Sequence, residues 1–400
     1  MTRTDRPAAP DAPEHGTDVG AAALEPRAQE PIALHLSRDG VPRGRDGARR
    51  GRRDGGRRGA RRRWALPALG VLLLALAVAA ACIGVAGVAP ADALAAIGAR
   101  LGIGSSALGP VGDAIVVDLR VPRILTACAV GAGLAIVGAV MQALVRNPLA
   151  DPYLLGVSSG ASVGAVLVLV TGLGAGIGGA LGGALLPAAA FAGGLLALLA
   201  TLGLAGAAGG ATPTRTVLAG VVVASAASAV VSLVIFWRAD GDAFREILAW
   251  LLGSLASSSW SSATIALVGA ALALPLLASG RMLDALQLGD SAAGALGVDV
   301  RRTRWALLVA CALVTGVLVS VSGAIGFVGL VVPHAVRLVV GASHALLLPA
   351  SGLAGSIVLL VADTVARAAF DPRELPVGIV TALIGAPVFA ALLLTGRVRT

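Results

Sequence analysis

The chain has no lysine, and only 13% of its 400 residues are charged and 3% aromatic. Without lysine it cannot form the Gly-x4-Gly-Lys-Ser/Thr loop that cradles nucleotide phosphates, so that motif is excluded. A soluble domain normally carries about 25% charged residues, and this chain falls far short of that. The three cysteines and four histidines are scattered, so we expect neither a disulfide framework nor a metal site.

Apolar residues make up 57% of the chain. A helix needs about 20 apolar residues to cross a bilayer. Suitable runs lie at 64–88, 124–145, 153–173, 180–206, 216–237, 258–278, 305–323, 325–341, 346–368 and 376–396. The sequence therefore predicts an all-α, polytopic membrane protein with about ten transmembrane helices in one domain, 64–400. Alanine and glycine dominate these runs, which favours close helix packing through small residues.

Residues 1–63 are rich in Arg, Gly, Pro and Ala and lack apolar periodicity, which predicts a disordered tail. Most of the net charge of +9 lies in this tail, and aromatic residues that could stack on bases are missing from its Arg-rich part. We therefore expect no nucleic-acid partner. A cationic flank before the first span follows the positive-inside rule. The expected location is a bacterial inner membrane, with membrane lipid around the helices and both termini cytoplasmic.

No acid or base lies in the middle of any predicted span, whereas ion-coupled carriers normally keep one there. Asp363 is the deepest acid, and Arg367 four residues later is a sufficient partner for it. A secondary carrier is therefore disfavoured. A membrane anchor whose working part is the Arg-rich tail is a second alternative, and deletion of residues 1–60 would abolish the function of an anchor but not of a transporter.

The segment DLRVPRIL (118–125) places Arg120 and Arg123 around Pro122 at the predicted outer mouth of the second span. Proline suits the first turn of a helix, where its missing N–H would be unpaired in any case. The two guanidinium groups could grip an acidic partner bidentately. Snorkelling of both side chains to the membrane surface is the simpler alternative.

The sequence resembles the FecCD-type permease family, the transmembrane subunits of type II ABC importers for ferric siderophores, haem and cobalamin. The resemblance covers essentially all of 64–400. It rests on DLRVPRIL (118–125), QALVRNPLADPYLLGVSSGA (142–161), LAGV (218–221), WLLGS (250–254), LGDSAAGALGV (288–298), GFVGLVVPHAVR (326–337), ADTVAR (362–367) and ELPVGIVTALIGAP (374–387).

The resemblance implies an importer subunit without catalytic residues or a bound cofactor. It would move a ferric siderophore, or a related iron or cobalamin-type chelate, driven by ATP on a partner. The implied partners are a second permease subunit, two ATP-binding cassette subunits and an external substrate-binding protein. The residue roles carried over are docking of the binding protein by Arg120, Arg123 and Arg367, ATPase coupling in the loop 281–304 by Gly289, Asp290, Ala293, Leu296 and Gly297, and an inner gate at Thr214 and Thr216.

Overall fold

The computed structural model describes residues 45–84, 87–173, 180–210, 212–238, 241–369 and 373–394. Every regular element in these ranges is helical. The elements are α1 (Arg45–Cys82), α2 (Pro90–Arg100), α3 (Gly109–Ala114), η1 (Ile115–Arg120), α4 (Val121–Val145), η2 (Pro152–Leu155), α5 (Val157–Thr171), α6 (Ala180–Ala207), α7 (Pro213–Arg238), α8 (Gly241–Leu251), α9 (Trp260–Leu277), α10 (Gly280–Gln287), α11 (Asp290–Ala295), α12 (Val300–Ser322), α13 (Val328–Val340), α14 (His344–Ala368) and α15 (Val377–Leu394).

The chain divides into two units, Met1–Asp54 and Gly55–Thr400. In the first unit the described residues are helical and form the beginning of α1. This differs from the expected disordered tail, because residues 45–63 are helical, while 1–44 lie outside the described residues. Arginine and alanine are good helix formers. Extending an existing helix also costs little, since each added residue gains one hydrogen bond.

The apolar helices of the described residues agree with the expectation of about ten spans. Within the part of the chain that the structure describes, seven helical segments are long and apolar enough to span a bilayer: Trp64–Cys82, Gly109–Val145, Gly183–Ala207, Pro213–Arg238, Trp260–Leu277, Val300–Ser322 and His344–Ala368. Three shorter apolar helices, Val157–Thr171, Val328–Val340 and Val377–Leu392, correspond to the other three predicted spans. The all-α prediction is therefore correct for the described part of the chain.

The second span is longer than its apolar run suggested. Its helical segment begins at Gly109 and passes through α3 and the π-helical turn η1 into α4. Pro122 lies just after the π-helical turn, inside this continuous segment. A π-helical turn changes the hydrogen-bond spacing, so the helix can pass a residue that has no N–H to donate.

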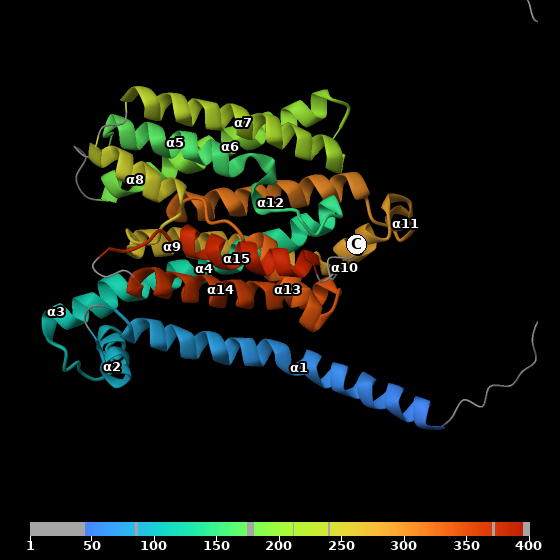
Figure 1. The fold of residues 1–400 in the computed structure, drawn as a ribbon, viewed down its shortest axis with the longest axis horizontal. Helices are drawn as coiled ribbons and strands as arrows, with labels where there is room; N and C mark the ends of the chain where they lie inside the picture. Colours follow the sequence, from blue (N-terminus) through green and yellow to red (C-terminus); the bar gives the residue numbers. More distant parts are fainter. Residues whose placement is uncertain are drawn as a thin grey trace, which may run out of the picture. The chain divides into compact units, whose positions relative to one another are not determined.

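Helix α4 is the most buried span of the Gly55–Thr400 unit and packs against α9, α12, α13 and α14 (Figure 1). Two glycines of α4 meet glycines of the partner helices, Gly131 beside Gly355 and Gly138 beside Gly329. A Cβ added to Gly138 would collide with the Gly329 carbonyl, so only glycine permits this approach of the backbones.

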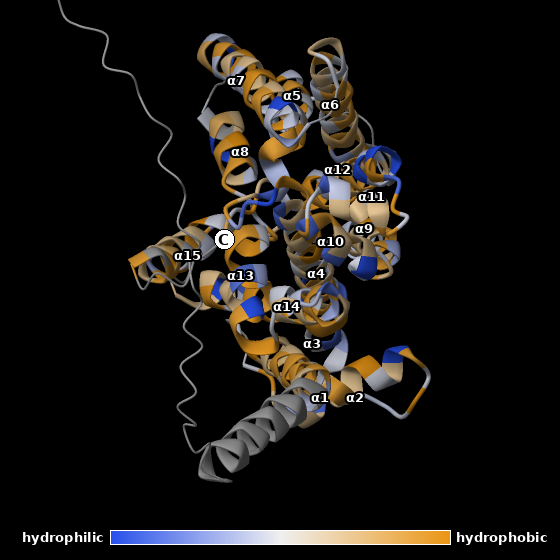
Figure 2. Cartoon of the chain, turned by 90° about the vertical axis from the view of Figure 1, so that its right-hand side faces the viewer, coloured by the Kyte–Doolittle hydropathy of each residue, from blue (hydrophilic) through white to orange (hydrophobic). Residues whose placement is uncertain are grey.

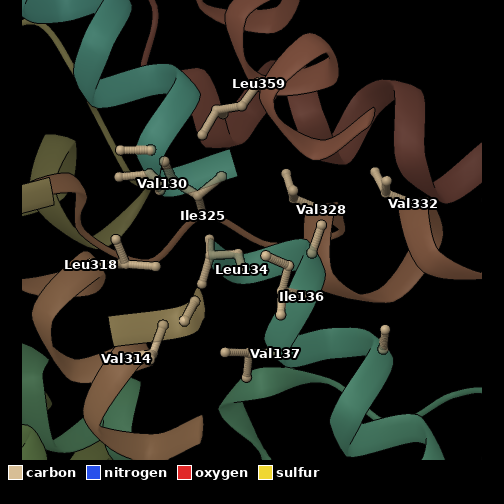
Figure 3. Packing of buried hydrophobic residues seen from close by; sticks show 14 of the residues in the cluster. Val130, Leu134, Ile136, Val137, Val314, Leu318, Ile325, Val328, Val332 and Leu359 are labelled. Carbon is tan, nitrogen blue, oxygen red and sulfur yellow. The ribbon is translucent and has the colours of Figure 1, made fainter. Parts of the chain in front are cut away.

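Branched apolar side chains fill the space between these helices (Figure 3). Leu134 of α4, Leu318 of α12 and Leu359 of α14 are all at most 1% exposed. Helices α5, α6 and α7 pack together, and α12 contacts both α5 and α6 (Figure 1). Viewed from the α10–α11 end, hydrophobic residues cover much of the long helices, and hydrophilic residues gather near α11 and the start of α12 (Figure 2).

Candidate functional site

Charged side chains meet near the C-terminal end of α1, in a group that we call the α1-end cluster: Arg120, Arg123, Asp363, Arg367 and Glu374. Arg123 Nε donates to both carboxylate oxygens of Asp363 at 3.0 and 2.9 Å, and its Nη2 donates to Oδ1 at 2.9 Å. The two side chains are only 9% and 2% exposed. This is a buried, multiply bonded ion pair, the arrangement in which a guanidinium binds a carboxylate most strongly.

The other members of the cluster extend this pair. Arg123 Nη1 also donates to Glu374 Oε2 at 2.7 Å, and the Glu374 side chain is 43% exposed. Arg367 Nε lies 3.6 Å from Asp363 Oδ2, four residues earlier on α14. The Arg367 interaction expected from the sequence is therefore present. Arg123 is nevertheless the closer partner of Asp363.

Arg120 and Arg367 also bind the end of α1. Arg120 Nη1 donates to the carbonyl oxygens of Ala81 and Cys82 at 2.7 and 3.3 Å. Arg367 Nη2 donates to Ala80 O at 3.2 Å. The last carbonyls of a helix lack partners within the helix and carry partial negative charge, so two guanidinium groups stabilise this terminus.

The structure thus brings together all three arginines predicted to dock a binding protein. Their guanidinium N–H groups, however, bind acceptors within this chain. Arg120 and Arg123 are only 5% and 8% exposed. Sequence reasoning missed the pairing of Arg123 with Asp363 because these residues are 240 positions apart. It also missed Glu374, the more exposed acid of the cluster.

A second cluster, Arg146, Asp290 and Arg304, lies at the opposite ends of the spans, and we call it the α11 cluster. Asp290 begins α11 and accepts hydrogen bonds from Arg304 Nη2 and Nη1 at 3.1 and 3.3 Å. It also pairs with Arg146, whose Nε donates to Leu286 O at 3.0 Å. These contacts hold the α10–α11 pair against the end of α4 and the start of α12.

The α11 cluster makes the stability of the protein depend on pH. The pKa of Asp290 is lowered from 3.8, above all by its hydrogen bonds with Arg304. Burial is the next largest effect and opposes this, while the charges of Arg304 and Arg146 and the hydrogen bond from Arg146 lower the pKa further. A carboxyl with a lowered pKa stabilises the fold above its unfolded pKa and loses that effect as pH falls through the folded value.

We therefore expect Asp290→Asn to lower the melting temperature by a constant amount between pH 7 and about pH 5, because the wild-type carboxyl is ionised in both states over that range. Below about pH 4 the difference should shrink, because the carboxyl of the unfolded wild-type chain takes up a proton there while the folded carboxyl, with its lowered pKa, resists protonation. Melting curves of both proteins in detergent across this range check it. A difference that stays unchanged at the lowest pH would contradict the assignment.

The residues predicted for ATPase coupling occupy different environments. Gly289 and Gly297 flank α11 with φ angles of 109° and 85°, which glycine adopts readily. Leu296 is 65% exposed, and Leu288, just before α11, is 69% exposed. Ala293 is fully buried, so it packs inside this chain and does not present a contact surface. Exposed Leu288 was missed because the sequence pattern did not show which loop residues face outwards.

Thr214 and Thr216, the predicted gate residues, lie in the first turn of α7. Thr214 is exposed, whereas Thr216 is 4% exposed and its hydroxyl donates to Thr212 O at 3.0 Å. Only Thr214 is therefore available to a solute or a partner in this structure. Within the described residues, no group of three His, Cys, Asp or Glu side chains is placed to hold a metal ion.

Comparison with protein families gives one match over most of the chain. The model of the FecCD transport family matches residues 72–395. Among curated proteins, the cobalamin import system permease protein BtuC of Halobacterium salinarum is 45% identical over 290 residues, which cover 71% of this chain and 74% of that protein. The hemin transport system permease protein HmuU of Yersinia pestis is 41% identical over 284 residues, covering 70% and 83%.

The fold also matches a solved structure, described as an inward-facing conformation of a metal-chelate type ABC transporter. The TM-score is 0.70 at 33% sequence identity, and the match covers 82% of this chain and 98% of the other. The agreement extends over nearly the whole of the known chain, so the two chains share the helix arrangement described above.

Proposed function

Because this chain belongs to the FecCD transport family, we propose that it moves a large metal chelate across the membrane, with a ferric siderophore as the first candidate. It is a permease subunit of a type II ABC importer and is not itself an enzyme. The family match over residues 72–395 is the observation that carries this proposal. Cobalamin is the second candidate, because a relative that is 45% identical is named for it.

ABC importer permeases work with ATPase and substrate-binding partners. For this chain we propose two such permease subunits, two ATP-binding cassette subunits and an external binding protein, in a bacterial inner membrane with both termini cytoplasmic. The absence of lysine supports a separate ATPase subunit, since the chain has no Gly-Lys-Ser/Thr phosphate loop. The many arginines near the α10–α11 end support placing that end on the cytoplasmic side.

The cargo is tested by reconstituting the complete complex in vesicles. The binding protein and the chelate are supplied on the side of the membrane opposite the ATPase subunits, and ATP is supplied on the side of the ATPase subunits. Labelled ferric siderophore, cobalamin and haem are supplied in separate assays. We expect accumulation of a ferric siderophore with ATP and none without it. Accumulation of cobalamin or haem alone would replace the siderophore assignment. Uptake by the chain without any ATPase subunit would overturn the importer proposal itself.

We further propose that the surface around the α1-end cluster receives acidic residues of the binding protein through Arg120, Arg123 and Arg367. Charge pairs between two partners mainly set the association rate and weaken as salt increases. The substitution Arg367→Glu should therefore reduce the association rate, and the reduction should be largest at low ionic strength. The rate is measured by immobilising the transporter complex on a surface and adding soluble binding protein. An association rate equal to wild type at low salt would count against docking here.

A further inference from the structure

A cavity of about 590 Å³ lies between the α6–α7 connection, α11 and the start of α12. Its volume is within the range of about 300–1,000 Å³ that is usual for small-molecule sites. The wall includes Gly209, Gly210 and Thr212 on one side, and Arg301 and Trp305 on the other. The exposed Leu288 and Leu296 and the predicted gate residues do not line it. Of the predicted coupling residues only Asp290 does, and its pairing with Arg304 and Arg146 does not account for the rest of the wall.

Positive charge exceeds negative charge around this cavity. Asp290 and Arg304 also line it, and the Asp290 carboxylate is shared between Arg304 and Arg146. Arg301 is exposed and, within the described part of the chain, has neither an ion pair nor a hydrogen bond from its guanidinium. Two guanidinium groups and one carboxylate therefore line the cavity, and this excess of positive charge favours an anionic ligand.

The surrounding residues add to this positive field. Arg215 Nη1 donates to the Gly209 carbonyl at 2.7 Å, which places its charge beside the cavity, and no acidic side chain of the described residues pairs with it. Arg304 is only 9% exposed, and its Nε–H is buried without a hydrogen-bond partner. Helix α7 begins directly after Thr212, and the N-terminus of a long helix attracts anions.

The location indicates what kind of anion fits. Helix α6 ends beside the cavity, and the spans α7 and α12 begin there, so the cavity lies at the boundary between the apolar helices and the polar end of the protein. Trp305 is partly buried in the second turn of α12, and tryptophan is enriched at membrane surfaces. Basic pockets between transmembrane helices bind anionic lipid headgroups.

We propose that this cavity binds the phosphate of an anionic phospholipid headgroup, with Arg301 as a direct partner and Trp305 beside the lipid chains. The proposal rests on the membrane-embedded permease fold but not on the identity of the cargo. The Asp290 carboxylate is already occupied by two arginines, so it does not prevent Arg301 from pairing with a phosphate.

The test uses the full-length chain in detergent and measures by native mass spectrometry how much phosphatidylglycerol it retains in competition with phosphatidylcholine. Wild type should prefer phosphatidylglycerol. Arg301→Gln should reduce that preference about fivefold, because one basic residue near an anionic surface contributes about that much. Arg302→Gln is the matched control, since Arg302 is the adjacent exposed arginine but pairs with Asp299 and does not line the cavity.

Equal retention of both lipids by wild type would overturn the proposal, as would equal losses in the Arg301 and Arg302 variants. A third arm adds inorganic phosphate to the lipid-free chain and follows its melting temperature. If phosphate raises the melting temperature of wild type but not of Arg301→Gln, and wild type shows no preference for phosphatidylglycerol, the cavity binds a soluble phosphate and the lipid proposal is wrong. Because these arms require no transport, they give the same answer whether or not the proposed cargo is imported.

Discussion

Replacing Asp363 with alanine is expected to lower the free energy of unfolding by about 3–5 kcal/mol, the usual cost of removing one partner of a buried ion pair. The change leaves the Arg123 guanidinium, whose side chain is 9% exposed, without its closest counter-ion. It also removes the acid nearest to Arg367, which holds the end of α1. Unfolding of the purified protein in mixed micelles, followed by circular dichroism, measures the loss.

Glu374→Ala provides the matched control for this prediction, because Glu374 binds the same arginine but its side chain is 43% exposed. An exposed pair contributes about 0–1 kcal/mol, so this variant should unfold almost like wild type. A double variant, Arg123→Leu with Asp363→Leu, should lose less stability than Asp363→Ala alone, because it buries no unpaired charge. Equal losses for Asp363→Ala and Glu374→Ala would refute the account of the buried pair.

Leu296→Glu is expected to abolish most ATP-driven uptake while leaving the fold intact. Leu296 directly follows α11 and is 65% exposed, so a charge there meets solvent in the free chain but would meet the ATPase surface in the complex. Loss of an apolar anchor at an interface costs about 2 kcal/mol or more, which is about thirtyfold in affinity. Uptake and ATP hydrolysis, measured on the same reconstituted complex, show whether the two are uncoupled.

Ala293→Trp separates an effect on coupling from an effect on folding. Ala293 is fully buried in this chain, so the larger side chain should overpack the loop and lower stability by about 1–3 kcal/mol. The two variants should therefore differ: Leu296→Glu melts like wild type but fails to transport, whereas Ala293→Trp melts earlier. Normal transport by Leu296→Glu would remove this leucine from the coupling surface.

The α11 cluster links the segment that carries Leu296 and Ala293 to the rest of the fold. Arg146 at the end of α4 and Arg304 in α12 both hold Asp290, so a force applied to the α10–α11 pair would reach the two most buried spans directly. Such a linkage is what a coupling loop requires, because a loosely attached loop would move without moving the membrane helices.

Sequence alone determined the all-α class, the ten spans and the family. The spans can be found because the thickness of a bilayer sets the length of an apolar run, and the family can be found because its motifs occur in a fixed order along the chain. It also identified Arg120, Arg123 and Arg367 as residues at one end of the spans. What those arginines bind was decided by tertiary structure, since hydrogen-bond partners such as Arg123 and Asp363 are distant in the chain and adjacent only after the helices pack. The inward orientation of Ala293 and the cavity beside Arg301 have the same origin. Each depends on how several helix ends meet, and no single segment of sequence contains that information.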